Sequence, residues 1–266
     1  MTLWEAALLG IVQGVTEFLP VSSSGHLVIV QALLGVSEPS LTFDVMVHLG
    51  SLAAVLAALK DDWVPMVKGV FGKNADPDGR RRILLVLAGS VPVGVVGLLF
   101  KDVLEPLFES AAAAGLMLLA TGTVLWFADR AARKSRGGAG AKDLAGVTFA
   151  DAFWIGCGQA LAVLPGLSRS GTTIAAGMLR GISRESAARF AFLLSIPAIL
   201  GAAILELPAL ASGSADYAAL LVGAAAAAVS GYFAIASFLR FLRGGALIGF
   251  AAYTWIVGVM VLVWIR

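Results

Sequence analysis

The chain of 266 residues is 59% hydrophobic and only 14% charged, and its mean hydropathy is +0.91. A soluble domain is usually about 45–50% apolar and about 25% charged, so this composition excludes a water-soluble globule and indicates an integral membrane protein. The net charge of +2 is too small to suggest a nucleic-acid partner, and the single cysteine, Cys157, excludes both an internal disulfide and a zinc site built from several cysteines.

The apolar segments are of two kinds. Two of them are interrupted: Leu3 to Leu34 by Pro20 and three serines, and Phe149 to Leu179 by a Pro-Gly pair and a further polar run. Each interrupted segment predicts two short helices joined by a polar loop at membrane depth, which is tolerated only where the loop is buried in protein or lines a wet cavity. None of the segments alternates like a strand of an outer-membrane barrel. Six uninterrupted segments approach the ~20 apolar residues of a transmembrane helix; they are 41–59, 83–100, 111–128, 187–207, 217–239 and 246–265.

The basic residues indicate how these segments cross the membrane. Most of the 19 Lys and Arg residues lie in four groups, at 60–82, 129–143, 180–189 and 240–243. With six spans and two re-entrant hairpins, all four groups fall on one side, which the positive-inside rule assigns to the cytoplasm. Both termini then lie outside, and the N-terminus, which has Glu5 and no basic flank, predicts no cleavable signal peptide.

The two interrupted segments resemble each other without a gap. The matched pairs, first segment then second, are Ala6–Ala152, Gly10–Gly156, Gln13–Gln159, Ser22–Ser168, Ser24–Ser170 and Gly25–Gly171. We therefore predict an all-α integral membrane protein with one domain over 1–266, built from six transmembrane helices and two re-entrant helical hairpins. Residues 1–128 (hairpin 3–34 and three spans) and 148–266 (hairpin 149–181 and three spans) would form an inverted-topology repeat. The alternative is two hairpins with purely structural breaks.

Ionisable residues at membrane depth are costly and mark candidate functional sites. Glu17 lies one helical turn after Gln13, so the two side chains share a helix face, and His26 closes the first loop. Arg169 lies in the second loop at the start of a short helix, where free N–H groups and a guanidinium together suit a phosphate. Loop hydroxyls could bind phosphate oxygens or supply a nucleophile; they belong to Ser22, Ser23, Ser24, Ser168, Ser170, Thr172 and Thr173.

The carboxylate and the imidazole at this depth suit a general acid or base, or ligands of a divalent cation. A phosphate on Arg169 would be repelled by Glu17, and an oxygen-bound Mg²⁺ or Ca²⁺ between them would relieve the repulsion. A structural ion pair between Glu17 and Arg169 is the alternative. We expect His48 to be a packing or interfacial residue, and Asp44 and Asp151 to be solvated or to cap helices.

Two stretches of the sequence resemble the motifs of a known family. Residues 14–26, Gly-Val-Thr-Glu-Phe-Leu-Pro-Val-Ser-Ser-Ser-Gly-His, resemble the first motif of the bacterial undecaprenyl-diphosphate phosphatases, the bacitracin-resistance family. Together with Gln13 this stretch fits the (Glu/Gln)-x-x-x-Glu pattern of that family. Residues 165–173, Pro-Gly-Leu-Ser-Arg-Ser-Gly-Thr-Thr, are similar to its second motif, Pro-Gly-x-Ser-Arg-Ser-x-x-Thr. The resemblance extends over essentially the whole chain.

This resemblance implies hydrolysis of undecaprenyl diphosphate to undecaprenyl phosphate and inorganic phosphate, which recycles the lipid carrier of peptidoglycan synthesis and confers bacitracin resistance. It also implies the bacterial cytoplasmic (inner) membrane, a polyprenyl diphosphate and membrane lipids as partners, and a divalent cation, Mg²⁺ or Ca²⁺. The implied catalytic set is Glu17, His26, Ser23 and Arg169. Gln13 and Glu17 would face the metal, and Ser168, Ser170 and Thr173 would contact phosphate, to which the loop hydroxyls of Ser22, Ser24 and Thr172 are added.

We expect the diphosphate head to enter a pocket that opens toward the outer, periplasmic face, while the polyprenyl tail stays in the lipid. The nucleophile is either the Ser23 hydroxyl, activated by Glu17 or His26, or a water activated by Glu17, and the sequence leaves both open. The rival function is a transporter or flippase of an anionic lipid phosphate, because inverted repeats with broken helices are a transporter architecture. The glycine-rich segments 217–239 and 246–265 could support a homodimer.

Overall fold

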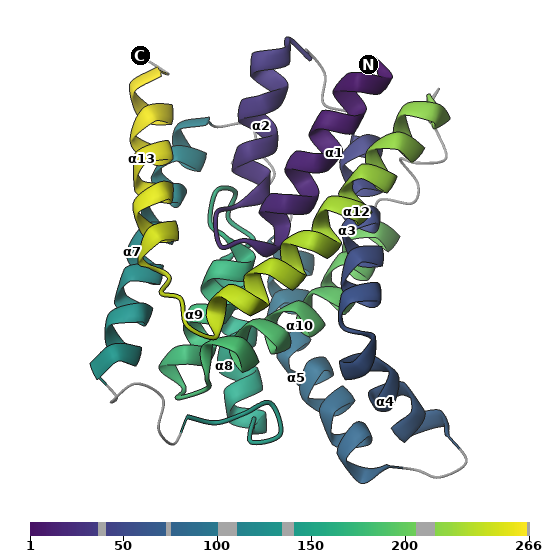
Figure 1. The fold of residues 1–266 in the computed structure, drawn as a ribbon, viewed down its shortest axis with the longest axis vertical. Coiled ribbons are helices and arrows are strands. Elements are labelled where there is room, and N and C mark those ends of the chain that lie inside the picture. The colour runs from purple at the N-terminus through teal and green to yellow at the C-terminus, as the bar shows by residue number, and fades with distance from the viewer. Residues whose placement is uncertain (37–40, 73–75, 101–110, 135–140, 206–215, 265–266) are drawn as a thin grey trace.

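A computed structural model describes the chain except for residues 37–40, 73–75, 101–110, 135–140, 206–215 and 265–266 (Figure 1). The described part is helical, and the isolated bridge between Lys142 and Ile182 is the one β-type pairing found in it. Both termini lie at the same end of the molecule (Figure 1). The helices are α1 Leu3–Phe18, α2 Ser23–Leu34, α3 Leu41–Ala58, α4 Lys60–Phe71, α5 Pro77–Leu99, α7 Ala111–Lys134, α8 Phe149–Leu161, α9 Arg169–Leu179, α10 Arg184–Leu205, α12 Tyr217–Leu242 and α13 Ile248–Trp264.

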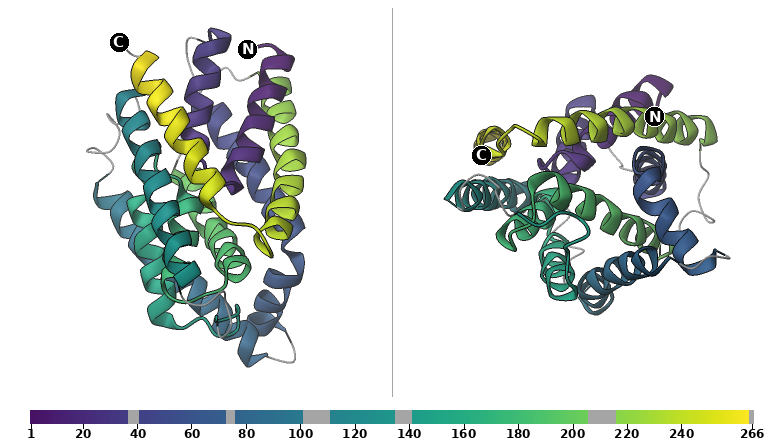
Figure 2. Two further views of the ribbon diagram at one scale, coloured as in Figure 1. Left: turned by 60° about the vertical axis from the view of Figure 1, so that its left-hand side comes forward. Right: turned by 60° about the horizontal axis from the view of Figure 1, so that its bottom comes forward.

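Both predicted helix breaks are present, between α1 and α2 and between α8 and α9. The α1–α2 hairpin enters from the end that carries the termini, and the α8–α9 hairpin enters from the opposite end (Figures 1 and 2). Their loops meet inside the molecule, where the Ser170 hydroxyl donates to the Leu19 carbonyl at 2.9 Å. The Gly166 N–H also approaches the Ser24 hydroxyl, at 3.5 Å. The two breaks therefore converge on one place in the fold.

The two hairpins begin in the same way. Thr2 and Glu5 form a capping box at the start of α1, and Thr148 and Asp151 form one at the start of α8. In each box the threonine side chain and the acidic side chain satisfy each other's backbone N–H groups, which would otherwise be free at a helix start. The hairpins thus start at positions that local sequence specifies.

Small residues let the hairpin helices lie close to long helices from the other half of the chain. Gly10 of α1 lies against Gly223 of α12, and Gly156 of α8 lies against Gly89 of α5, so closely that a Cβ on Gly10 or Gly156 would collide with a backbone oxygen of the partner. Likewise α3 packs on α12, and α10 packs on α5. Glycine permits this approach because it has no side chain to separate the backbones.

Helices occupy the positions of all six predicted spans, but they are not equally long. Helices α5, α7, α10 and α12 are long and apolar enough to cross a membrane, and the chain is therefore a multi-pass membrane protein. The segment 41–59 does not continue straight, because after α3 the chain turns by 84° into α4, and counting this bent pair gives up to five candidate spans. The bend comes where Lys60 and two aspartates follow an apolar helix. Because α13 has 17 residues, near the lower limit of about 17–25 for a spanning helix, the count of six stays a prediction.

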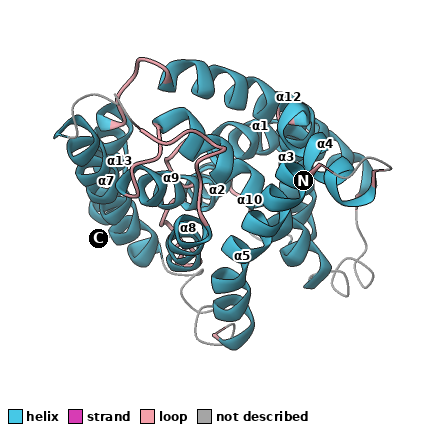
Figure 3. Cartoon of the chain, turned by 90° about the horizontal axis from the view of Figure 1, so that it is seen from below, coloured by secondary structure: helices cyan, strands magenta, loops and turns pink. Residues whose placement is uncertain are grey.

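The end opposite the termini carries the basic loops, and Figure 3 views the molecule from there. Buried acidic side chains bind several of these bases. Asp129 accepts hydrogen bonds from Arg133 and Arg184, both at 2.8 Å, and from the Leu247 N–H at 3.3 Å, which joins α7, α10 and the turn before α13. Asp151 is fully buried and accepts from side chains of two neighbouring loops. Of the two roles expected for Asp151, solvated or capping, the structure has the capping role.

The packing of α8 on α5 predicts a specific sensitivity to added volume. We expect Gly156→Ala to lower the free energy of unfolding by about 1–3 kcal/mol, because the new methyl group meets the rigid backbone of Gly89. The thermal unfolding midpoint of the purified protein in detergent measures this change. Gly201→Ala is the matched control, since a Cβ on this α10 glycine meets no atom within 4 Å. Equal midpoints for the two variants would contradict the close contact.

Candidate active site

A cavity of ≈ 540 Å³ opens where the two loops meet. Its apolar wall comes mainly from α2, α10 and the loop before α9. Its polar lining combines residues from both hairpins and from α3, which are Thr16, Glu17, Ser22, Ser23, Ser24, Gln31, Asp44, His48, Ser168, Arg169 and Ser170. The cavity thus brings together most of the residues that the sequence singles out, from segments about half the chain apart.

Glu17 and Arg169 form an ion pair that joins the two hairpins. Glu17, which is 8% exposed, also accepts hydrogen bonds from the Ser23 hydroxyl at 2.5 Å and from the Gln13 amide at 3.1 Å. Both carboxylate oxygens are therefore bound and the carboxylate is held in one orientation. The ion pair between Glu17 and Arg169, which the sequence offered as an alternative, is therefore present, and it joins the two halves of the chain.

One nitrogen of the Arg169 guanidinium is left over. NH2 donates to Glu17, whereas NH1 is buried and has no hydrogen-bond partner in the described part of the chain. A buried donor without a partner costs roughly 1–3 kcal/mol, and more when it is charged. Arg169 is also the first residue of α9, where the free N–H groups and the helix dipole add positive potential. Arg169 lines the cavity, and its buried, unpartnered NH1 is a donor that suits an anion bound beside it.

The loop serines form two similar pairs. The hydroxyls of Ser22 and Ser24 lie 3.3 Å apart, and those of Ser168 and Ser170 lie 3.2 Å apart. Ser168 caps α9 by accepting from the Gly171 N–H at 3.0 Å. Ser22 makes no such cap and has a φ of 69°, a left-handed conformation that costs energy for a residue other than glycine. In the second loop the Ser168 hydroxyl is thus engaged in capping α9. In the first loop the Ser22 hydroxyl caps no helix, and Ser22 and Ser24 line the cavity.

The two threonines of the second motif point elsewhere. The Thr172 hydroxyl donates to the carbonyl of Ser168 at 2.9 Å, and the Thr173 hydroxyl donates to that of Arg169 at 2.7 Å. Neither residue lines the cavity. In this geometry both hydroxyls serve the first turn of α9, and their phosphate-binding role stays a prediction.

His26 also points away from the cavity. Its Nδ1 donates to the Ser22 carbonyl at 2.8 Å, because a carbonyl can only accept, and its Nε2 lies 2.7 Å from the Tyr253 hydroxyl of α13. The two rings stack with their centroids 5.6 Å apart. The imidazole thus supports the strained first loop and joins α2 to α13. The catalytic role of His26 stays a prediction, because in this structure its two ring nitrogens are bound by the Ser22 carbonyl and the Tyr253 hydroxyl.

The imidazole beside Glu17 belongs to His48. Its Nε2 lies 4.0 Å from the Glu17 carboxylate, and its Nδ1 donates to the Asp44 carbonyl at 2.6 Å, so in the neutral ring the Nε2 lone pair faces Glu17. The sequence predicts a packing or interfacial role for His48 and a solvated or capping role for Asp44, whereas in the structure both line the cavity. A signal was present: Asp44, His48 and Ser51 recur at helical spacing and form a polar stripe on an apolar helix.

The oxygen atoms around Glu17 fit a hard divalent cation. Gln13 is completely buried; its nitrogen donates to Glu17, and its Oε1 has no partner in the described part of the chain. Together with the Glu17 carboxylate and the Ser23 hydroxyl, this carbonyl makes an oxygen donor set of the kind that Mg²⁺ and Ca²⁺ use. No group of three or more His, Cys, Asp or Glu residues able to hold a metal occurs among the described residues. A cation here would therefore complete its shell with phosphate oxygens and water.

Comparisons with known proteins match the chain over nearly its whole length. The model of the family described as bacitracin resistance protein BacA matches residues 6–260. A protein of Carboxydothermus hydrogenoformans named undecaprenyl-diphosphatase is 46% identical, covering 99% of this chain and 97% of the relative. Proteins of the same name from Halothermothrix orenii and Desulfosudis oleivorans are 41% and 47% identical, covering 99% and 96% of this chain and 98% and 95% of the relatives.

The ion pair predicts a double-mutant cycle. Arg169→Met leaves the buried Glu17 carboxylate without its cation, and we expect the free energy of unfolding to fall by about 3–5 kcal/mol. Adding Glu17→Gln should restore most of this loss, because a neutral amide can still bind Ser23. The thermal midpoint of each purified variant checks the cycle, and Arg240→Met, at an exposed arginine on α12, is the control. A double variant as unstable as Arg169→Met would show that the pair is not the cause.

Proposed function

The chain belongs to the bacitracin resistance protein BacA family, and from this membership we propose that it hydrolyses undecaprenyl diphosphate to undecaprenyl phosphate and inorganic phosphate. The family match covers residues 6–260, and relatives that are 41–47% identical over nearly full length carry the name undecaprenyl-diphosphatase. The family resemblance predicted from the sequence is thereby confirmed. The enzyme is a phosphatase, and bacitracin resistance and the recycling of the cell-wall lipid carrier follow from that activity.

The observation that carries this function is Arg169, which lines the cavity and whose buried NH1 has no hydrogen-bond partner in the described part of the chain. The terminal phosphate of a diphosphate would satisfy this donor and the N–H groups that begin α9. Positioned donors of this kind stabilise the charge that develops on phosphate oxygens during transfer. A transporter could use the same arginine, but it has little use for a hydroxyl held against a carboxylate, and the names of the relatives do not favour it.

Ser23 and Glu17 supply the reacting groups in one of two routes. In the first, the Ser23 oxygen attacks the terminal phosphorus, its proton passes to Glu17, and the bond to the bridging oxygen breaks to release undecaprenyl phosphate; water then hydrolyses the phosphoserine. In the second, Glu17 takes a proton from a water that attacks directly. The 2.5 Å hydrogen bond from Ser23 to Glu17 supports the first route. The protonated His48 ring would donate from Nε2 toward the same carboxylate, and His26 would contribute by holding the first loop.

A divalent cation, Mg²⁺ or Ca²⁺, belongs to the same proposal. Glu17 and the free Oε1 of Gln13 would hold it, and when bound it would reduce the repulsion between the carboxylate and the substrate phosphates. The four serines of the two pairs, Ser22 with Ser24 and Ser168 with Ser170, would add hydrogen bonds to phosphate oxygens.

We further propose the full topology of six spans and two re-entrant hairpins in an inverted repeat. The pairing of helices supports it, since α1 on α12 corresponds to α8 on α5, and α3 on α12 corresponds to α10 on α5. The capping boxes and the glycine contacts correspond in the same way. With the basic end in the cytoplasm, the protein lies in the bacterial inner membrane with its termini outside.

The cavity would then open toward the periplasmic face. Its walls continue from the loops along α2, the first turns of α3 and the last turns of α10, all of which run toward the end that carries the termini. Apolar and small residues on α2 and α10, including Val28 and Ala202, offer a surface for the first units of the polyprenyl tail. A homodimer is a weaker proposal, because Gly223 and Gly258, two of the glycines that suggested it, contact neighbouring helices within one chain.

Phosphate release in detergent tests the function directly, because no transport is possible there. We expect Glu17→Gln and Arg169→Lys to lower kcat for undecaprenyl diphosphate by about 10²-fold or more, since each removes a charge or a donor from the reacting phosphate. Ser23→Ala should be equally inactive if the hydroxyl attacks, and should retain partial activity if water does. Ser90→Ala, on α5 outside the cavity, is the control. Parental rates for Glu17→Gln or Arg169→Lys would refute the assignment.

The place of the lipid tail has its own test. Ala202→Trp fills the cavity wall on α10, and we expect it to raise KM for undecaprenyl diphosphate by about 10-fold or more. Hydrolysis of a short diphosphate such as isopentenyl diphosphate should change little, because its head reaches Arg169 without crossing this wall. Gly201→Trp on the neighbouring residue, which does not line the cavity, is the matched control. Equal loss on both substrates would place the tail elsewhere.

A further inference from the structure

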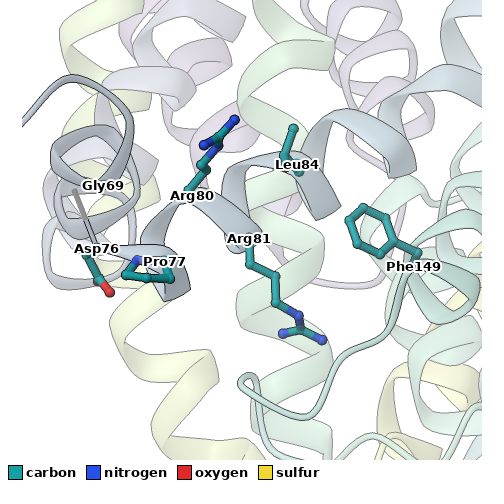
Figure 4. Close-up of a pocket in the computed structure, with 7 residues that line it drawn as sticks. All are labelled: Gly69, Asp76, Pro77, Arg80, Arg81, Leu84 and Phe149. Atoms are coloured by element: carbon teal, nitrogen blue, oxygen red, sulfur yellow. The ribbon is translucent and has the colours of Figure 1, made fainter.

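A second cavity, of ≈ 280 Å³, lies at the basic end of the molecule, between the α4–α5 hairpin and the start of α8 (Figure 4). It shares no lining residue with the candidate active site. Its principal lining residues are Pro77, Arg80, Arg81, Leu84 and Phe149. Figure 4 shows the two arginines leaving α5 in different directions, with Phe149 across from Arg81. The cavity therefore combines basic and apolar side chains at one place.

The walls of this cavity are held together by backbone contacts. Helices α4 and α5 lie so close that a Cβ on Gly79 would stand 2.5 Å from the Pro65 carbonyl oxygen. On the other side, the Arg81 guanidinium donates to the carbonyls of Ala145 at 3.0 Å and Val147 at 2.5 Å. Arg81 thus ties α5 to the segment that leads into α8. These contacts fix the positions of the cavity walls relative to one another.

The lining of this cavity carries two arginines and one aspartate, and the guanidinium of one of the arginines has no partner among the described residues. Asp76, its one acidic lining residue, accepts from the Asp78 and Gly79 N–H groups at 3.1 and 3.3 Å, so its carboxylate is engaged in capping α5. Arg80 is exposed, and its guanidinium has no hydrogen-bond or ion-pair partner in the described part of the chain. In contrast, Arg189 at the same end is bound by two carboxylates. The Arg80 guanidinium is therefore not paired with any carboxylate among the described residues.

An apolar strip leads away from the cavity along the outside of the molecule. On α5, Leu84, Leu87 and Val91 are 44%, 53% and 57% exposed, and they recur at helical spacing on one face. On α8, Phe149 and Phe153 are each 50% exposed. In a membrane protein such surfaces face acyl chains. The cavity thus places unneutralised positive charge at the head of a lipid-facing strip, which matches an amphiphile with an anionic head and apolar chains.

We propose that this cavity binds an anionic phospholipid, with its phosphate on Arg80 and Arg81 and its acyl chains against α5 and α8. Free phosphate could bind the same two arginines, but it has no apolar part that would contact the strip on α5 and α8. The strip therefore favours a lipid over the free anion. Basic pockets between helices at a membrane surface are suited to such headgroups. The site is separate from the catalytic cavity and does not depend on the reaction proposed there.

Lipid binding to the purified protein in detergent tests this proposal. Native mass spectrometry would compare phosphatidylglycerol, which is anionic, with phosphatidylcholine, which has no net charge. For the parent protein we expect at least fivefold stronger retention of one phosphatidylglycerol, and we expect Arg80→Gln to abolish this preference. Arg240→Gln is the matched control, because Arg240 is exposed, its guanidinium has no partner among the described residues, and it lies outside the cavity.

Two further arms make the outcome decisive. Inorganic phosphate at millimolar concentration should not displace the lipid, and its doing so would mean a site for the free anion. Phosphate release from undecaprenyl diphosphate in detergent without added phospholipid should be the same for Arg80→Gln and the parent, which shows that the variant is folded. Equal retention of both lipids by the parent, or equal loss of preference in Arg80→Gln and Arg240→Gln, would overturn the proposal.

Discussion

The ion pair between Glu17 and Arg169 requires the two hairpins to meet inside the molecule. Two charges inside an apolar layer are tolerable only together and only with further hydrogen bonds, and here they come from hairpins that enter from opposite ends. The pair therefore requires both helix breaks, both polar loops and their convergence. Ser23 and Gln13 complete the hydrogen bonds of the carboxylate. The proposed reaction site is thus also a polar connection between the two halves.

The chemistry of the cavity follows from which polar atoms are already satisfied. The threonines of α9 and the ring of His26 bind backbone carbonyls or Tyr253, so they stabilise the loops that carry the site. Three groups near Glu17 remain less occupied: NH1 of Arg169, Oε1 of Gln13 and Nε2 of His48. The proposed phosphate and hard cation would supply partners for these atoms.

The difference between polar groups that have protein partners and those that do not also applies to the basic end of the molecule. At the basic end, Asp129, Asp151 and Glu185 bind arginines from several helices, and these bases hold the fold together as well as orienting it. Arg80 has no such partner and stands beside an apolar, lipid-facing surface. Positive charge pairs internally at several places in this chain, and we propose two further uses for it: substrate binding at Arg169 and lipid binding at Arg80.

The membrane class, the two helix breaks and the residues of the Glu17–Arg169 pair could be predicted from the amino-acid sequence. These properties are written locally, in hydropathy, in Pro-Gly and Ser-rich runs, and in the cost of ionisable groups at membrane depth. Only the tertiary structure decided that His48 and not His26 faces Glu17, that the segment after Ala58 turns aside, and that Asp151 is buried. The partner of a side chain depends on how its helix is rotated and packed against helices distant in sequence, and no local pattern specifies that rotation.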